Sequence, residues 1–240
     1  MANTLAEKRD GRLWMNTNVN LLAPIGVMAF LGAGFLLFVS ALVLIQSLIV
    51  HKQRRTKAVL LVMLVISGAY LAAILVFSLT SHEKVLARGA EKYFCEIDCH
   101  LAYSVVDTRQ SKTLGNPPHQ TTAHGIYTVV TIKTRFDEAT ISPRRGDGLL
   151  YPNSRVLRLV DEHGNQYSAS DVGQSALTQT ISKPLTTPLR PGESYTTEIV
   201  FDLPAEAKPS TLLINEGEWV THFVVGHENS LLHRQTKFQL

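Results

Sequence analysis

The sequence predicts two transmembrane helices followed by an all-β sandwich. Residues 21–50 and 58–81 contain no charged residue, and each stretch is at least as long as the about 20 apolar residues that span a bilayer core. From residue 93 onward, short apolar runs are separated by turns rich in proline and glycine, which is typical of a sandwich. We therefore divide the chain into four parts: a tail (1–20), a helical hairpin (21–81), a connector (82–92) and a β-sandwich ectodomain (93–240).

The helices are predicted to anchor the chain with both termini outside. The loop of residues 51–57 carries four cations, Lys52, Arg54, Arg55 and Lys57. Dense Lys and Arg in a short loop hold that loop in the cytoplasm. Six cations at the other helix ends oppose this orientation and leave the inverted topology as an alternative: Lys8, Arg9, Arg12, Lys84, Arg88 and Lys92. We expect an uncleaved, multi-pass anchor in the inner (plasma) membrane, because the first apolar run is about twice the length of a signal-peptide core.

Charge excludes two classes of function. The formal net charge of +3 belongs to the segments that flank the helices, whereas the C-terminal part is close to neutral, so no nucleic-acid partner is expected. Neither predicted span contains Asp, Glu, Lys, Arg or His, which argues against an ion pathway or a proton relay within this chain. The lipid bilayer is the first predicted partner.

The strands of the predicted sandwich are read from alternation. In one run Leu101, Tyr103 and Val105 share a face, and in the next Val130 and Ile132 do so. Residues 163–165, His-Gly-Asn, have the composition of a hairpin turn. An immunoglobulin-like antiparallel sandwich of about seven to nine strands is predicted, with an open barrel as the alternative. The main predicted strands cover 101–106, 126–136, 155–160, 194–203, 211–215, 219–225 and 236–240.

The chain has two cysteines, Cys95 and Cys99, and His100 follows the second. An even cysteine count in an extracytoplasmic domain favours oxidation. Residues four apart on a strand are about 13 Å apart, whereas a disulfide needs its Cα atoms within about 7 Å. A local disulfide therefore requires a turn at residues 96–98. Reduced thiols and a small metal site remain alternatives.

Other polar residues give no catalytic pattern. The histidines lack metal-site spacing, and no nucleophile elbow, phosphate loop or Ser-His-Asp arrangement is present. Acidic residues such as Asp161 lie in or near turns, where such side chains bond their own backbone, and a calcium clip is the alternative. We expect neither an enzyme nor a cofactor. The sandwich edges and the loop of residues 141–153 are the candidate contact surfaces.

Two resemblances bear on function. The layout resembles cytochrome oxidase subunit II, whose copper motif continues C-x3-C-x3-H-x2-M. Here Tyr103 and Val106 occupy its histidine and methionine positions, so copper lacks ligands. Three stretches are similar to bacterial extracytoplasmic immunoglobulin-like domains of uncharacterised function, which implies a sandwich used in adhesion or complex assembly: YFCEIDCHLAYSV (93–105), LRPGESYTTEIVFDLP (189–204) and GHENSLLHRQTKFQL (226–240).

The functional hypothesis is a non-enzymatic, membrane-anchored interaction or assembly module, such as an accessory subunit of a membrane complex. Its second predicted partner is a membrane or extracytoplasmic protein. The alternative is a periplasmic redox or copper-binding protein that uses Cys95, Cys99 and His100.

Overall fold

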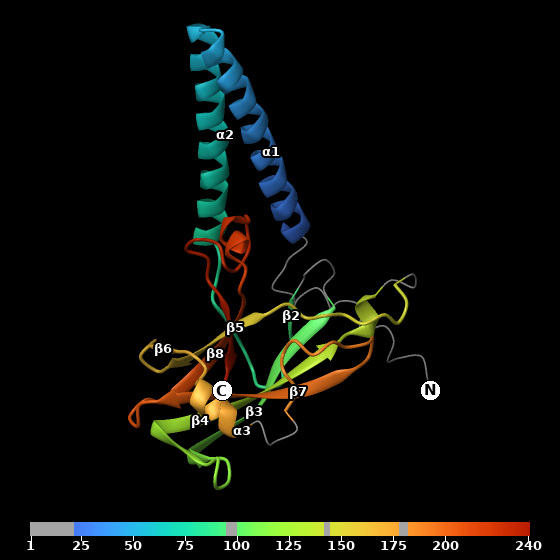
Figure 1. The fold of residues 1–240 in the computed structure, drawn as a ribbon, viewed down its shortest axis with the longest axis vertical. Helices are drawn as coiled ribbons and strands as arrows, with labels where there is room; N and C mark the ends of the chain where they lie inside the picture. The colour runs from blue at the N-terminus through green and yellow to red at the C-terminus, as the bar shows by residue number, and fades with distance from the viewer. Residues whose placement is uncertain (1–21, 95–99, 142–144, 178–181) are drawn as a thin grey trace. The chain divides into compact units, whose positions relative to one another are not determined.

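The computed structural model describes residues 22–94, 100–141, 145–177 and 182–240. These residues form two compact units (Figure 1). One unit contains the sandwich, residues 83–217 and 236–240, and the other contains the helices together with residues 218–235. Residues 218–235, predicted as part of the sandwich (93–240), thus fall in the helical unit, and residues 83–92 of the predicted connector (82–92) fall in the sandwich unit.

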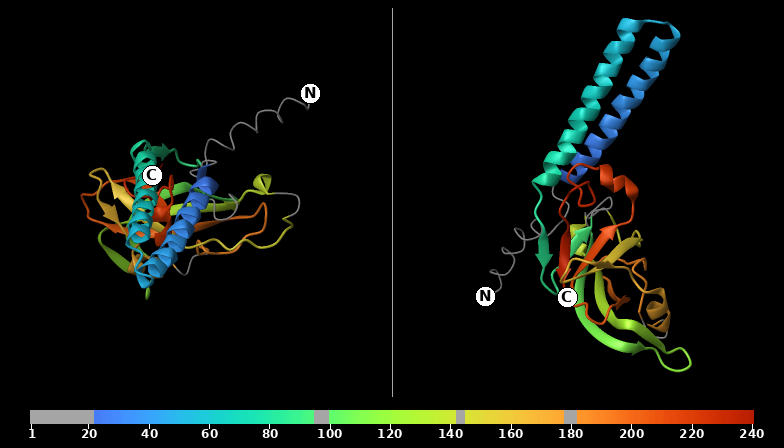
Figure 2. Two further views of the ribbon diagram at one scale, coloured as in Figure 1. Left: turned by 90° about the horizontal axis from the view of Figure 1, so that it is seen from above. Right: turned by 90° about the vertical axis from the view of Figure 1, so that its left-hand side faces the viewer.

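The two apolar stretches form long helices, α1 (Leu22–Ile49) and α2 (Gln53–Leu79), which lie side by side (Figures 1 and 2). Both are long and apolar enough to cross a membrane, and almost none of their described apolar side chains is buried in the protein. The helix ends differ from the apolar boundaries. Because α2 begins at Gln53, three of the four loop cations lie in its first two turns, and only Val50, His51 and Lys52 lie between the two helices.

The sandwich consists of a four-stranded and a five-stranded sheet. The four-stranded sheet has the order β2 (Lys92–Phe94), β3 (Leu101–Leu114), β4 (Thr121–Phe136) and β7 (Ser194–Leu203), all antiparallel. The five-stranded sheet has the order β1 (Lys84–Leu86), β9 (Thr236–Gln239), β8 (Pro209–Glu216), β5 (Arg155–Asp161) and β6 (Gln166–Tyr167). One pair, β1 with β9, is parallel.

The main core lies between the two sheets and contains the side chains that the sequence predicted to share a face, such as Tyr103 and Ile132. Alternate residues of β3 and β4 point into it, because successive side chains of a strand face opposite sides. The five-stranded sheet supplies the opposing wall. The largest contributors are fully or almost fully buried: Leu101, Tyr103, Val105, Val130, Ile132, Phe136, Phe201, Leu159, Leu212, Ile214 and Phe238.

A second apolar cluster covers the other face of the four-stranded sheet. Helix α3 (Asp171–Leu177) packs there against Tyr127 and Val200. A Cβ atom at Gly173 would lie 2.5 Å from Val200 Cγ1, so the glycine permits this close approach. The sheet is therefore buried on both faces under α3, which explains why β4 is apolar at consecutive positions such as Val129 and Val130.

The fold class predicted from the sequence is confirmed as two long apolar helices followed by a two-sheet β-sandwich. Six of the predicted strands are present as β3, β4, β5, β7, β8 and β9. The predicted hairpin turn is also present, with Gly164 at φ +85° between β5 and β6. The strand predicted at 219–225 is wrong. Residues Trp219–Phe223 form a 3₁₀ helix, η2, because this apolar stretch packs with the helices and has no sheet to join.

Candidate functional site

The cysteine pair predicted at Cys95 and Cys99 lies outside the described residues, so the local disulfide stays a prediction. Of the described neighbours, His100 stacks on Phe136 with ring centroids 5.6 Å apart, and its Nδ1 lies 2.5 Å from Thr140 Oγ1. The positions that correspond to the remaining copper ligands give no support to a metal centre. Tyr103 is fully buried in the core, and Val106 is exposed.

A polar network lies on the four-stranded sheet near its β2 edge and joins residues of β2 and β4 with the residues next to them in the chain, Glu91 and Asp137. The Arg135 guanidinium donates from Nε to Glu91 Oε1 and from Nη2 to Glu91 Oε2, both at 2.7 Å. Its Nη1 lies 3.1 Å from Asp137 Oδ1. The Tyr93 hydroxyl donates to Asp137 Oδ2 at 2.6 Å. A bidentate arginine–carboxylate pair of this kind is among the stronger polar interactions in proteins.

The electrostatics of this network are those of a structural ion cluster. The hydrogen bond from Arg135 lowers the pKa of Glu91. Burial works to raise the pKa of Asp137, but hydrogen bonds from Arg135 and Tyr93 outweigh it and lower that pKa. Burial and the bond to Asp137 raise the pKa of Tyr93. Both carboxylates are thus held ionised and the phenol neutral, which stabilises the native state and provides no poised acid or base near neutral pH.

Two cations lie inside the sandwich beside this network. Lys92 is fully buried, and its Nζ donates to the Ile214 carbonyl at 2.8 Å, linking β2 to β8 of the opposite sheet. The Arg155 side chain is also buried, and its guanidinium lies 4.2 Å from the centroid of the Phe94 ring. Lys92 is therefore a core residue and not, as its position after the second apolar stretch suggested, a charge flanking the membrane. Its place in the core depends on a carbonyl 122 residues away, which no local pattern indicates.

The long outer edge of the sandwich is already covered. β7 is the edge strand of its sheet, and a long open edge can accept a strand from another chain. Residues before, within and after α3 instead occupy its outward backbone groups. Ser170 N–H donates to Val200 O, Val200 N–H to Gln174 Oε1, Gln174 Nε2 to Glu198 O, Glu198 N–H to Ser182 Oγ, and Lys183 N–H to Thr196 O.

The other edges are poor templates for strand addition. β1, β2 and β6 have only two or three residues each. β2 covers only the first residues of β3. Among the described strands, residues 107–114 of β3 pair with β4 on one side only, so their other side is an open edge. Register shifts near Asp107 and Thr113 interrupt that stretch, and Arg109 and Lys112 place charges along it. Irregularities and charges of this kind protect natural edges against pairing, so the predicted edge contacts lose support.

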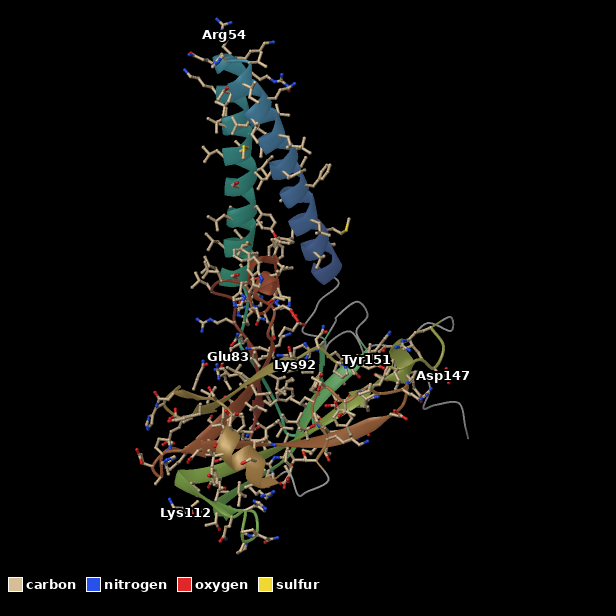
Figure 3. All side chains as sticks on the ribbon, viewed as in Figure 1. Arg54, Glu83, Lys92, Lys112, Asp147 and Tyr151 are labelled. Atoms are coloured by element: carbon tan, nitrogen blue, oxygen red, sulfur yellow. The ribbon has the colours of Figure 1, made fainter. Side chains whose placement is uncertain are left out.

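The loop after η1 (Glu138–Thr140) presents exposed apolar and aromatic side chains on a fixed backbone. Its described part, residues 145–153, is named here the 145–153 loop. Leu150 and Leu189 exchange both backbone hydrogen bonds, at 2.8 and 3.0 Å. On either side of Leu150, Leu149 is 42% exposed and Tyr151 67% exposed. Figure 3 labels Tyr151 and Asp147 of this loop. The Arg190 side chain donates to the Asp147 carbonyl at 3.2 Å and holds the turn.

Asp161 is a satisfied turn residue, as the sequence analysis expected. Its carboxylate accepts from the His163 backbone N–H, from the backbone and side-chain amides of Asn165, and from the Tyr167 hydroxyl, at 2.8 to 2.9 Å. Burial works to raise the pKa of Asp161, but these hydrogen bonds lower it to about 2. Within the described residues, no group of three or more His, Cys, Asp or Glu side chains could hold a metal ion.

The predicted topology residues gather at one end of the helical hairpin. Lys52, Arg54, Arg55 and Lys57 are all exposed there, and Figure 3 labels Arg54. A cluster of exposed cations between two apolar helices fits the expected pattern for a cytoplasmic turn. The side of the membrane on which it lies stays a prediction.

Comparison with known proteins assigns no family. No family model matches the chain, and no curated protein matches it. Among solved structures, the secreted protein MPT63 of Mycobacterium tuberculosis overlaps with a TM-score of 0.42 at 14% identity, over 67% of this chain and 100% of its own. A conserved hypothetical protein of Bacillus anthracis overlaps with a TM-score of 0.40 at 14% identity, over 55% and 92%. The yjhA protein of Bacillus subtilis overlaps with a TM-score of 0.38 at 11% identity, over 65% and 98%.

Overlaps this weak assign neither a family nor a function. The class of protein rests instead on the chain's own strand pairing and helices: a two-sheet β-sandwich attached to two apolar helices.

Proposed function

We propose that this chain is a membrane-anchored extracytoplasmic module that binds another membrane or extracytoplasmic protein, as an accessory or assembly subunit. The observation that carries the proposal is the pairing of two lipid-compatible helices with a sandwich whose 145–153 loop exposes Tyr151 and Leu149. The helices supply the anchor, and the loop supplies the contact surface.

The anchor follows from the surface of the helices. Apolar side chains such as Leu31, Phe35 and Leu64 are 58 to 69% exposed along both. Removing one such side chain from water contributes about 1.5–3 kcal/mol. A hairpin with this many exposed apolar residues is compatible with a hydrocarbon environment, and helices satisfy their backbone groups internally there.

The contact surface follows from chemistry and preorganisation. Tyrosine is enriched at the centres of protein interfaces, and its rigid ring buries a large area at a small entropic cost. Tyr151 lies next to the backbone bonds of Leu150, and Arg190 holds the adjacent turn. A partner that covered Tyr151 and Leu149 would therefore order few additional residues on binding.

The test is site-specific photocrosslinking in cells. A photoreactive residue at position 151 is expected to yield one discrete crosslinked protein. The matched control is position 163, whose side chain is 73% exposed on the β5–β6 turn and should give no discrete product. Absence of a product at 151, or equal products at both positions, would remove the 145–153 loop as the contact surface.

Orientation needs its own measurement. In a chain with Cys95→Ser and Cys99→Ser, a single cysteine at position 163 should react with a membrane-impermeant thiol reagent on intact cells. A single cysteine at position 52 should react only after the membrane is opened. The reverse pattern would show that the sandwich is cytoplasmic, and the extracytoplasmic proposal would fail.

A further inference from the structure

Residues 218–235, named here the 218–235 segment, fold against both helices at the end of the hairpin opposite Arg54. The Tyr70 hydroxyl of α2 donates to the Phe223 carbonyl at 2.7 Å. After α2, Ser81 Oγ accepts from the Arg234 backbone N–H at 2.8 Å. On α1, a Cβ atom at Gly26 would lie 2.4 Å from Val225 O, so only glycine allows this approach. Figure 1 shows η2 beside the end of α2.

The segment exposes a cluster of large apolar side chains. Trp219 is 70% exposed and stands edge-on to the Phe223 ring at 5.6 Å. Leu232 has φ +64°, a left-handed conformation that is unfavourable for a leucine and here accompanies 61% exposure. Exposing such an apolar surface to water is unfavourable in free energy, whereas exposing it to hydrocarbon is not. The exposed members are Trp219, Val220, Phe223, Leu231 and Leu232.

The polar groups of the segment bond mostly within it. Asn229 Nδ2 donates to Thr221 Oγ1 at 2.9 Å, the Ser230 hydroxyl donates to the Val224 carbonyl, and His222 Nδ1 lies 3.0 Å from the Trp219 carbonyl. Successive backbone turns run from Glu218 to His233. In a low-dielectric environment, the polar groups of an irregular backbone must form hydrogen bonds within the protein, as these groups do.

The length of the helices leaves room for this segment at membrane level. At about 1.5 Å per residue, α1 and α2 (28 and 27 residues) are about 40 Å long, against about 30 Å of hydrocarbon. The excess of about 10 Å extends into the interfacial layers; on α2 its cationic first turns take up much of it at the opposite end, whereas α1 has no charged residue along its length. Tryptophan is enriched in these layers, because its ring is apolar and its N–H is polar.

We propose that the 218–235 segment inserts its apolar side chains into the headgroup–acyl boundary of the bilayer that surrounds α1 and α2. The occupant of this surface is lipid, because the exposed residues continue the apolar surface of the helices on which the segment is folded. This inference rests on the proposed function to the extent that the helices must span the membrane.

The test uses tryptophan depth in nanodiscs that hold the full chain and no other membrane protein. The chain has two tryptophans, so Trp14→Phe leaves Trp219 as the reporter. Lipids brominated near the headgroup end of the acyl chain should remove at least about half of its emission, because interfacial segments lie about 5–10 Å deep. Bromine at the bilayer centre should quench it less, and aqueous iodide should have little effect.

Two single-tryptophan controls use Trp14→Phe with Trp219→Phe. Leu64→Trp lies within α2 and reports whether the helices are inserted. His163→Trp, with an exposure close to that of Trp219, should respond to iodide alone. If Leu64→Trp is quenched by brominated lipid but Trp219 responds only to iodide, the lipid inference is overturned and a protein partner replaces it. If Leu64→Trp is not quenched, the membrane-spanning proposal itself fails.

Discussion

Replacing Arg135 by glutamine tests whether the polar network at the β2 edge stabilises the sandwich. The variant removes both 2.7 Å bonds to Glu91 and the 3.1 Å contact with Asp137. The Asp137 carboxylate is only 7% exposed, so it loses a charged partner where water cannot fully replace it. Breaking a fully buried ion pair costs about 3–5 kcal/mol. Because Arg135 itself is 29% exposed, we expect a loss of about 2–3 kcal/mol in unfolding free energy.

Arg109 provides the matched control. It bonds Glu198 at 2.9 Å from the same sheet, but its side chain is 42% exposed. Exposed pairs contribute about 0–1 kcal/mol, so Arg109→Gln should change little. The assay is pulse proteolysis of the full chain in detergent at increasing urea, supported by thermal denaturation, where the Arg135→Gln loss corresponds to about 5–10 °C.

The pH dependence gives an independent readout. The pKa values of Glu91 and Asp137 are lowered from their ordinary 4.5 and 3.8. A carboxyl group whose pKa is lowered by folding stabilises the native state at pH values above its ordinary pKa. This contribution is lost as the pH falls through the lowered pKa. The cost of Arg135→Gln should therefore be larger at pH 7 than near pH 3. Equal costs at the two pH values, or equal costs for Arg109→Gln and Arg135→Gln, would refute the reasoning.

Three further outcomes are expected. Gly26→Ala should push Val225 away and speed amide hydrogen exchange in the 218–235 segment, with α2 unchanged as the internal control; unchanged exchange would contradict the close contact. Hydrogen bonds from Asn165 and its neighbours lower the pKa of Asp161 to about 2, so its carboxylate stabilises the native state above about pH 4 and loses this effect as the pH falls to 2. Asp161→Asn should therefore lose less stability than the unchanged protein between about pH 4 and pH 2, as measured by thermal denaturation at both pH values. Phe201→Ala, in the fully buried core, should cost about 3–5 kcal/mol in urea unfolding, and a cost under about 1 kcal/mol would place the ring elsewhere.

The helices could be predicted because hydrocarbon imposes a length and an apolar composition that residues 21–50 and 58–81 satisfy. Their ends could not, because backbone hydrogen bonding continues past the apolar boundary. α2 therefore includes Arg54, Arg55 and Lys57 in its first two turns. Charged residues therefore indicate where the membrane-spanning part of a helix ends, but they do not indicate where the helix itself ends.

The sandwich could be predicted where one face of a strand is buried, as along β4 with Val130 and Ile132. At residues 219–225 the same criterion gave a wrong prediction, because the structure has a 3₁₀ helix there. Their apolar side chains serve a different environment, beside α1 and α2, and sequence periodicity does not identify which surface will cover a side chain. The buried Lys92 and the covered edge of β7 depend on residues distant in the chain, so local reasoning missed both.

The strand order also determines how the sandwich bears mechanical load. Between residues 22 and 240, where the structure describes the connections, the chain passes between the two units three times: before β1, after β8 and before β9. These strands are neighbours in one sheet, and their pairing places the start of β1, the end of β8 and the start of β9 at the same end. A force that pulls on the sandwich through these connections is therefore divided among three adjacent strands that hydrogen-bond to one another, so no single strand has to bear the whole load.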